Sequence, residues 1–190
     1  MTGVESLYPF LYRDGDGDGT GDVTAVLAEV RRSTAEKAVE IVELRRRMAV
    51  EYVHPVIVGK RALPAISLTA DVATVTGIAE REGIDAIFAH QLRYLADPAD
   101  IALGISADGD NASVLAGLMT AKNLGLLTIA LVGTDGGRVA AANAADHLLT
   151  VASDDPCVIK ELQVTTYHIL WELVHVFFEQ PGVLDPGVVT

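Results

Sequence analysis

A polar loop at residues 106–113 carries the densest set of side chains that could bind a ligand. The apolar run 101–106, Ile-Ala-Leu-Gly-Ile-Ser, leads into it, and it continues as Ala-Asp-Gly-Asp-Asn-Ala-Ser. Hydroxyls and backbone N–H groups at the start of a helix bind anions, whereas carboxylates attract a cation or a basic group. The loop predicts a small polar ligand, and its two carboxylates leave a cation or a basic sugar open as that ligand.

Three side chains near the C-terminus have the spacing of a metal site. His168, Glu172 and His175 fall at positions i, i+4 and i+7, so one helix face could present them to a divalent metal. Trp171 and Val174 lie between them and favour a helix that packs against a core. We therefore predict a packing helix rather than a metal site here.

An acidic segment near the N-terminus resembles a calcium loop. Residues 14–22 read Asp-Gly-Asp-Gly-Asp-Gly-Thr-Gly-Asp, but Ala25 stands where the twelfth-place carboxylate belongs. A flexible linker is the favoured interpretation.

Apolar runs alternate with helical patterns from residue 62 onward. We predict strands at 63–68, 101–106, 127–133 and 147–151, and helices at 71–82, 84–96, 112–123, from 138, and from 155 to about 180. This alternation predicts an α/β fold with a parallel, doubly wound sheet flanked by helices. Ligands then bind beyond the carboxyl ends of the strands, where the polar stretches 67–71, 106–113 and 133–138 fall.

The N-terminal part predicts a long helix and sets the domain boundaries. Asp22 is expected to cap a helix that runs to about Val53, with one apolar face. The predicted organisation is an aromatic segment and acidic linker at 1–21, one domain at 22–180, and a tail at 181–190. The aromatic cluster at 7–12 is expected to dock on the body or on a sister subunit.

Charge and composition exclude several classes of partner. The 190 residues carry a net charge of −12, which repels nucleic acid and anionic membrane surfaces. The single cysteine, Cys157, excludes an internal disulfide and a zinc-thiolate cluster. No apolar run is long enough to span a membrane, and the N-terminus lacks a secretory signal pattern. We therefore expect a cytoplasmic protein.

An ordered set of motifs resembles a known family. They are LPAISLTAD (63–71), IFAHQL (87–92), PADIALGIS (98–106) with NASVL (111–115), LGLLTIALVGTDGG (124–137) and YHILWEL (167–173). Together they resemble the sugar isomerase (SIS) domain superfamily, and more closely its sedoheptulose 7-phosphate isomerase (phosphoheptose isomerase) family. The resemblance implies a three-layer SIS-type fold and a homodimer or homotetramer with active sites at subunit interfaces. It also implies a ring-opened sugar phosphate as substrate.

Two loops of this chain depart from the family pattern. The family's Gly-Asn-Gly-Gly-Ser loop is missing, and residues 37–41, where it should fall, read Lys-Ala-Val-Glu-Ile. One strand of the sheet is therefore expected to be missing or replaced by the long N-terminal helix. The family's phosphate loop, Ser-Thr-Ser-Gly-Asn-Ser, is replaced by Ser106, Ala107, Asp108, Gly109, Asp110 and Asn111. A carboxylate about 4 Å from a phosphate is repelled by about 4 kcal/mol per charge pair at an effective dielectric of 20.

The resemblance also assigns site residues. His168 stands at the family's catalytic histidine, and Glu51 stands at its catalytic glutamate when residues are counted back across the region of lost similarity. The implied substrate-binding residues are Thr69, Asp71, Ser106, Asp108, Gly109, Asn111, Ser113 and Glu161. No metal ligand is assigned, because Lys160 stands at the glutamine position that metal-binding members use. No cofactor is expected with certainty, and zinc stays open.

Two functions of different classes follow. The first is a sugar phosphate isomerase-like protein with impaired or altered activity, in which His168 and Glu51 move a proton through an enediol-like intermediate. The alternative is a non-catalytic SIS-fold subunit that recognises another protein. The two altered loops motivate this alternative.

Overall fold

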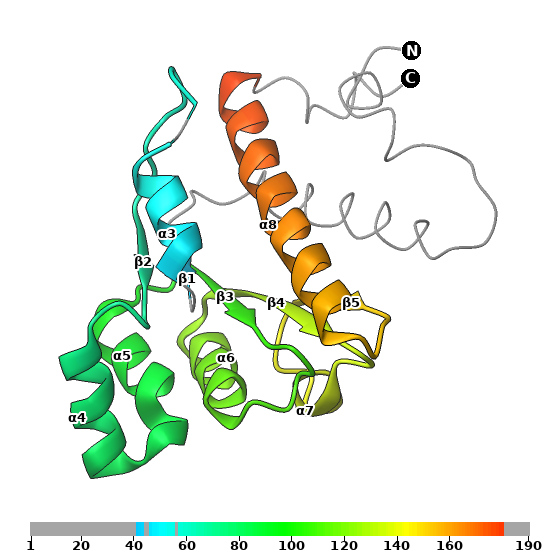
Figure 1. Ribbon diagram of the computed structural model, residues 1–190. Helices are drawn as coiled ribbons and strands as arrows, with labels where there is room; N and C mark the ends of the chain where they lie inside the picture. Colours follow the sequence, from blue (N-terminus) through cyan, green and yellow to red (C-terminus); the bar gives the residue numbers. More distant parts are fainter. Residues whose placement is uncertain (1–40, 44–45, 56, 181–190) are drawn as a thin grey trace. The chain divides into compact units, whose positions relative to one another are not determined.

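The computed structural model describes residues 41–43, 46–55 and 57–180 (Figure 1). The chain divides into two compact units, one of them Ala38–Trp171 and the other formed by Met1–Lys37 with Glu172–Thr190. The larger unit holds the sheet. The acidic segment 14–22, the N-terminal segment 1–21 and the tail 181–190 lie outside the described residues, so their boundaries stay predictions.

The larger unit is built on a five-stranded parallel sheet with the order β2-β1-β3-β4-β5. The strands are β1 (Ile41–Glu43), β2 (Ala65–Ser67), β3 (Ile101–Ile105), β4 (Leu127–Gly133) and β5 (His147–Val151). All residues of β3 and β4 are buried, which explains why both strands read as continuous apolar runs. The predicted parallel α/β sheet is confirmed.

Helices flank this sheet, as the alternating pattern predicts. They are α3 (Arg46–Val53), α4 (Val72–Glu82), the 3₁₀ turn η1 (Ile84–Ala86), α5 (Ile87–Leu95), α6 (Ala112–Leu124), α7 (Gly137–Ala141) and α8 (Pro156–Glu179). Helix α6 packs on β3 and β4, whereas α3 packs on β1 and β2 (Figure 1). In the part of the chain that the structure describes, no helix is long and apolar enough to cross a bilayer.

The core lies between the sheet and helices α5 and α6. Its centre includes Leu92, Leu118 and Ala130, each fully buried. Gly104 on β3 allows the close approach of α6, because a Cβ at this position would lie 2.9 Å from Leu118 Cδ1. Burial of this apolar surface is the main source of stability for such a domain.

The structure corrects the prediction for the region before residue 53. Residues Ile41–Glu43 form strand β1, not part of a helix, and α3 begins only at Arg46. Strand β1 lies between β2 and β3, with Ile41 paired to Ala65 on one side and to Ile101 on the other. Three residues thus occupy the sheet position for which a missing strand was expected. The apolar residues 41 and 42 fit a helical face and a buried strand equally well, so periodicity alone could not separate the two.

Candidate active site

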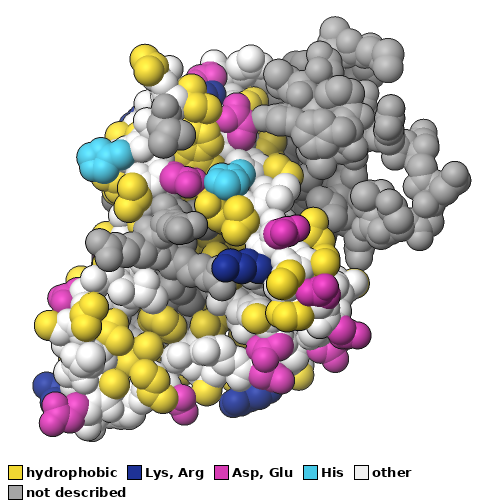
Figure 2. All heavy atoms as spheres, in the orientation of Figure 1, with side chains coloured by type: hydrophobic (Ala, Val, Ile, Leu, Met, Phe, Trp, Pro, Cys, Tyr) yellow, Lys and Arg dark blue, Asp and Glu magenta, His cyan; other side chains and the backbone are white. Residues whose placement is uncertain are grey.

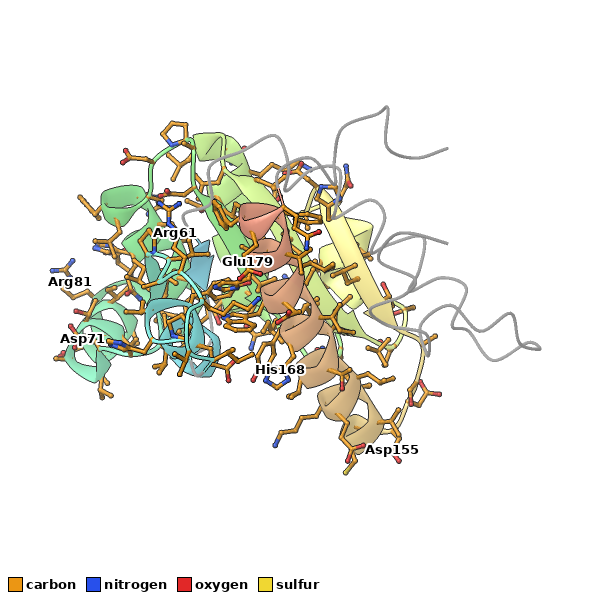
Figure 3. The ribbon with its side chains drawn as sticks, turned by 90° about the horizontal axis from the view of Figure 1, so that it is seen from above. Arg61, Asp71, Arg81, Asp155, His168 and Glu179 are labelled. Atoms are coloured by element: carbon orange, nitrogen blue, oxygen red, sulfur yellow. The ribbon has the colours of Figure 1, made fainter. Side chains whose placement is uncertain are left out.

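A carboxylate and an imidazole from distant parts of the sequence meet between α3 and α8. Glu51 Oε2 lies 3.6 Å from His168 Nε2. The His168 side chain is 53% exposed and that of Glu51 is 26% exposed, so a ligand in solvent can reach both. In Figure 3 the imidazole projects from α8 on the side of α3. The structure brings together the two residues to which the sequence assigned acid–base chemistry.

Two aromatic residues of α8 also contact Glu51. The Tyr167 hydroxyl donates to Glu51 Oε1 at 3.4 Å, and its ring lies 4.2 Å from the His168 ring, centre to centre. The Trp171 indole N–H donates to the backbone carbonyl of Glu51 at 3.0 Å. The sequence assigned Trp171 only a packing role and Tyr167 none, although both lie within one helical turn of His168.

The loop after β3 is held together by its own side chains. Ser106 Oγ accepts the Gly109 N–H at 3.0 Å and donates to Asp108 Oδ1 at 3.2 Å. Asp108 Oδ1 also accepts the Asp110 N–H at 2.9 Å. Two backbone N–H groups that could bind an anion are therefore engaged inside the loop. The Asp108 carboxylate occupies donors that a phosphate would need.

Three polar residues that could cap a helix, Asp108, Asp110 and Asn111, precede α6, and the structure uses the last of them. Asn111 is the N-cap of α6, and its Oδ1 accepts from Val114 N at 3.0 Å and from Ser113 Oγ at 2.7 Å. Asp110 instead accepts the Arg138 N–H at 2.9 Å, from the first turn of α7. Asp and Asn both make good N-caps, so the sequence could not select Asn111.

Two glycine-containing loops touch at this end of the sheet. Gly109 has a φ of +78°, and a Cβ there would lie only 2.0 Å from Gly136 O. A Cβ at Gly137 would lie 2.5 Å from Asp108 O. The loops after β3 and β4 therefore pack backbone against backbone.

Acidic side chains dominate this end of the sheet. Figure 2 shows carboxylates gathered over the loops that follow β3, β4 and β5. The exposed members are Asp108, Asp110, Asp135, Asp154 and Asp155. Their combined charge opposes the approach of a dianion.

The two predicted ligand residues after β2, Thr69 and Asp71, make hydrogen bonds within the loop and at the start of α4. The Thr69 hydroxyl lies 2.9 Å from that of Ser67. Asp71 is the N-cap of α4 and accepts the Ala73 N–H at 3.0 Å and the Thr74 hydroxyl at 2.6 Å. The hydroxyl and the N–H of Thr74 hold the pKa of the Asp71 carboxyl below its usual range.

A cavity of about 810 Å³ lies beside this loop. It is lined by α3, β2, α4 and α5, with His90 and Tyr94 among its polar residues, and Asp71 belongs to its wall. Figure 2 shows hydrophobic side chains exposed over α4 and α5 as well. Glu51 and His168 are not part of this cavity.

Two buried glutamines anchor the ligand loops, and sequence reasoning missed both. Gln163 of α8 donates to Ser106 O at 2.7 Å, at the end of β3. Gln91 of α5 donates to Leu68 O at 2.9 Å, just after β2. Each is a lone polar residue on an otherwise apolar helix face, which is the signal that could have identified it.

The remaining predictions on α8 concern exposed residues and a metal. Glu161 is exposed two helical turns before His168, and Lys160 beside it is exposed as well. Within residues 41–43, 46–55 and 57–180, no group of three His, Cys, Asp or Glu side chains is arranged to hold a metal ion. Among these described residues, His168, Glu172 and His175 are therefore not arranged as a metal site, and zinc is not supported.

Comparison with known proteins places these features in context. The family model of the SIS domain matches residues 44–133. The phosphoheptose isomerase of Desulfovibrio desulfuricans is 35% identical over 142 residues, which cover 74% of this chain and 67% of that protein. The phosphoheptose isomerase of Solidesulfovibrio magneticus is 37% identical over 142 residues, which cover 74% and 68%.

Solved structures agree with the sequence comparisons. The phosphoheptose isomerase of Neisseria gonorrhoeae superposes with a TM-score of 0.69 at 26% identity, over 80% of this chain and 85% of that chain. The phosphoheptose isomerase of Francisella tularensis superposes with a TM-score of 0.70 at 25% identity, over 92% and 99%.

Proposed function

Because this chain belongs to the phosphoheptose isomerase family of SIS-domain proteins, we propose that it interconverts an aldose and a ketose form of a ring-opened sugar phosphate. Glu51 and His168 are the two proton-transfer groups. The observation that carries the proposal is the 3.6 Å separation between Glu51 Oε2 and His168 Nε2, on a surface that a ligand can reach.

The reaction needs one group to move a proton between carbons and another to serve the oxygens. One of the pair takes the proton from the carbon next to the carbonyl, while the other protonates the carbonyl oxygen, giving an enediol. The first group then returns its proton to the neighbouring carbon, and the second takes the proton from the other hydroxyl. Both groups end in their starting states, so the protons balance over the cycle.

Recognition of the substrate is expected to differ from that of the relatives. The Asp108 carboxylate occupies donors in the loop after β3, and Asp110 adds a second negative charge near it. Phosphate binding at this loop is therefore weakened, and catalytic efficiency on a sugar phosphate is lowered with it. Thr69, Asp71, Asn111, Ser113 and Glu161 stay candidate substrate contacts. Asp71 and Asn111 also cap the N-termini of α4 and α6, so they stabilise these helices as well.

The expected oligomeric state and location rest on the family and on the composition of the chain. We expect a homodimer or homotetramer and a cytoplasmic location. The relatives are isomerases by name, so they favour this activity over the protein-recognition alternative.

The test is turnover of sedoheptulose 7-phosphate by the full chain, followed by NMR of the sugar. Glu51→Gln and His168→Ala are each expected to lower kcat by about 10²–10⁴-fold, the usual contribution of a general acid or base. Glu80→Gln, an exposed carboxylate of α4, is the matched control and should leave kcat unchanged. Equal turnover by wild type and His168→Ala would refute the assignment.

A further inference from the structure

Helix α3 ends just before a proline, which leaves one carbonyl without its usual donor. In an α-helix the carbonyl of residue i accepts the N–H of residue i+4, so Glu51 C=O would accept from residue 55. Residue 55 is Pro55, which has no N–H. The backbone carbonyl of Glu51 therefore needs a donor from elsewhere in the fold.

The neighbouring carbonyls at this helix end have backbone donors. Val50 O accepts the N–H four residues later at 2.8 Å, and Tyr52 O accepts a backbone N–H from the segment before β2 at 2.9 Å. Glu51 O lies between them in sequence and accepts the Trp171 indole N–H at 3.0 Å. A side chain of α8 thus replaces the missing backbone donor.

This hydrogen bond lies next to the reacting groups. Trp171 follows His168 by three residues on α8, and residues so spaced are neighbours on a helix surface, with Cβ atoms about 5–6 Å apart. Glu51 is consequently attached to α8 both through its carbonyl, which accepts from Trp171, and through its carboxylate, which lies beside His168 and accepts from Tyr167. Trp171 is only 6% exposed, whereas the His168 side chain is 53% exposed, so the indole bond is the sheltered point.

We propose that Trp171 is a positioning residue, which fixes the separation between the two proton-transfer groups by bonding the Glu51 carbonyl that Pro55 leaves without a donor. This role rests on the proposed function of Glu51 and His168. Proton transfer depends steeply on distance, and a displacement of about 1 Å can lower a rate by about 10²-fold. The indole acts through Glu51 and does not itself react.

The first test is Trp171→Phe, which keeps an aromatic ring and removes the N–H. We expect kcat for sedoheptulose 7-phosphate to fall by about 10–100-fold while KM changes by less than about 3-fold, because alignment is lost and substrate contacts are kept. A purely structural role would lower the melting temperature and leave kcat at 20 °C unchanged. That result would overturn the proposal.

The second test restores the donor from the backbone. Pro55→Ala supplies an N–H that can reach Glu51 O by extending α3 by one residue, and this variant should keep near-wild-type kcat. In the Pro55→Ala background, Trp171→Phe should lower kcat by less than about 3-fold. If the Trp171→Phe loss has the same size in both backgrounds, the carbonyl bond is not what positions Glu51.

A measurement without turnover separates this inference from the proposed function. Trp171 is the single tryptophan of the chain, so an ¹H–¹⁵N spectrum contains one indole N–H signal. We expect this N–H to exchange with solvent at least about 100-fold more slowly than that of free tryptophan, in wild type and in Glu51→Gln alike. Exchange as fast as free tryptophan would overturn the inference even if Trp171→Phe failed to fold. A protected indole with no turnover by the wild type would refute the proposed function alone.

Discussion

The contact between α3 and α8 and the loop after β3 differ in which of their polar groups a ligand could reach. At the first, the side chains of Glu51 and His168 face each other and are reachable from solvent. At the second, Ser106 and Asp108 are engaged with the loop's own N–H groups. The two proposed proton-transfer groups are thus accessible, whereas donors of the loop after β3 are occupied. On this proposal, catalysis and substrate recognition can change separately within one domain.

Among variants that test how the loop after β3 is held, we expect the largest change in stability at Gln163. Gln163→Met removes the donor to the buried Ser106 carbonyl, and a buried carbonyl left unpaired costs about 1–3 kcal/mol. The melting temperature should fall by roughly 2–4 °C for each kcal/mol in a chain of this size. Scanning calorimetry measures this change in melting temperature.

Gln91→Met is the matched control for that experiment. It removes the equivalent donor at Leu68, after β2, and should destabilise the protein without changing ligand binding at the loop after β3. If both variants alter phosphate binding equally, the two loops are not independent.

An intermediate effect is expected at Asp108. Asp108→Ser removes a negative charge and frees the Asp110 N–H, so the affinity for inorganic phosphate should rise by about 10-fold. This gain is smaller than the full Coulomb repulsion between a carboxylate and a phosphate, because Asp108 is exposed and solvent screens its charge. Asp108→Asn removes the charge and keeps the acceptor, so its gain should be smaller. Calorimetric titration measures both, and unchanged affinity in Asp108→Ser would show that the carboxylate does not limit phosphate binding.

The smallest effect is expected at Asp71 and depends on pH. The Thr74 hydroxyl and N–H lower the pKa of Asp71 in the folded chain, so the ionised carboxylate stabilises the fold. This stabilisation is present above the ordinary Asp pKa and is lost as the pH falls through the lowered folded value. The melting temperature of wild type relative to Asp71→Asn should therefore decline below about pH 4. A difference independent of pH would contradict this.

The sequence predicted the central strands of the sheet well, because strands buried on both faces consist of continuous apolar runs. It failed at Ile41–Glu43, where the apolar residues fit the period of the predicted helix as well as a strand. It also paired Glu51 with His168 only through the family resemblance, since spacing along the chain says nothing of their distance. Gln163 and Trp171 were missed because each acts on a backbone carbonyl supplied by another element. Such a partner exists only once the chain has folded.

The backbone contact between Gly109 and Gly136 has a consequence for loop exchange. A side chain at Gly109 would strike the Gly136 carbonyl, and one at Gly137 would strike the Asp108 carbonyl, so the segments 106–111 and 133–138 constrain each other. A phosphate-binding loop grafted from a relative into the first segment alone would meet the wrong neighbour. Both segments would have to be exchanged together, and libraries built on this scaffold should vary them as a pair.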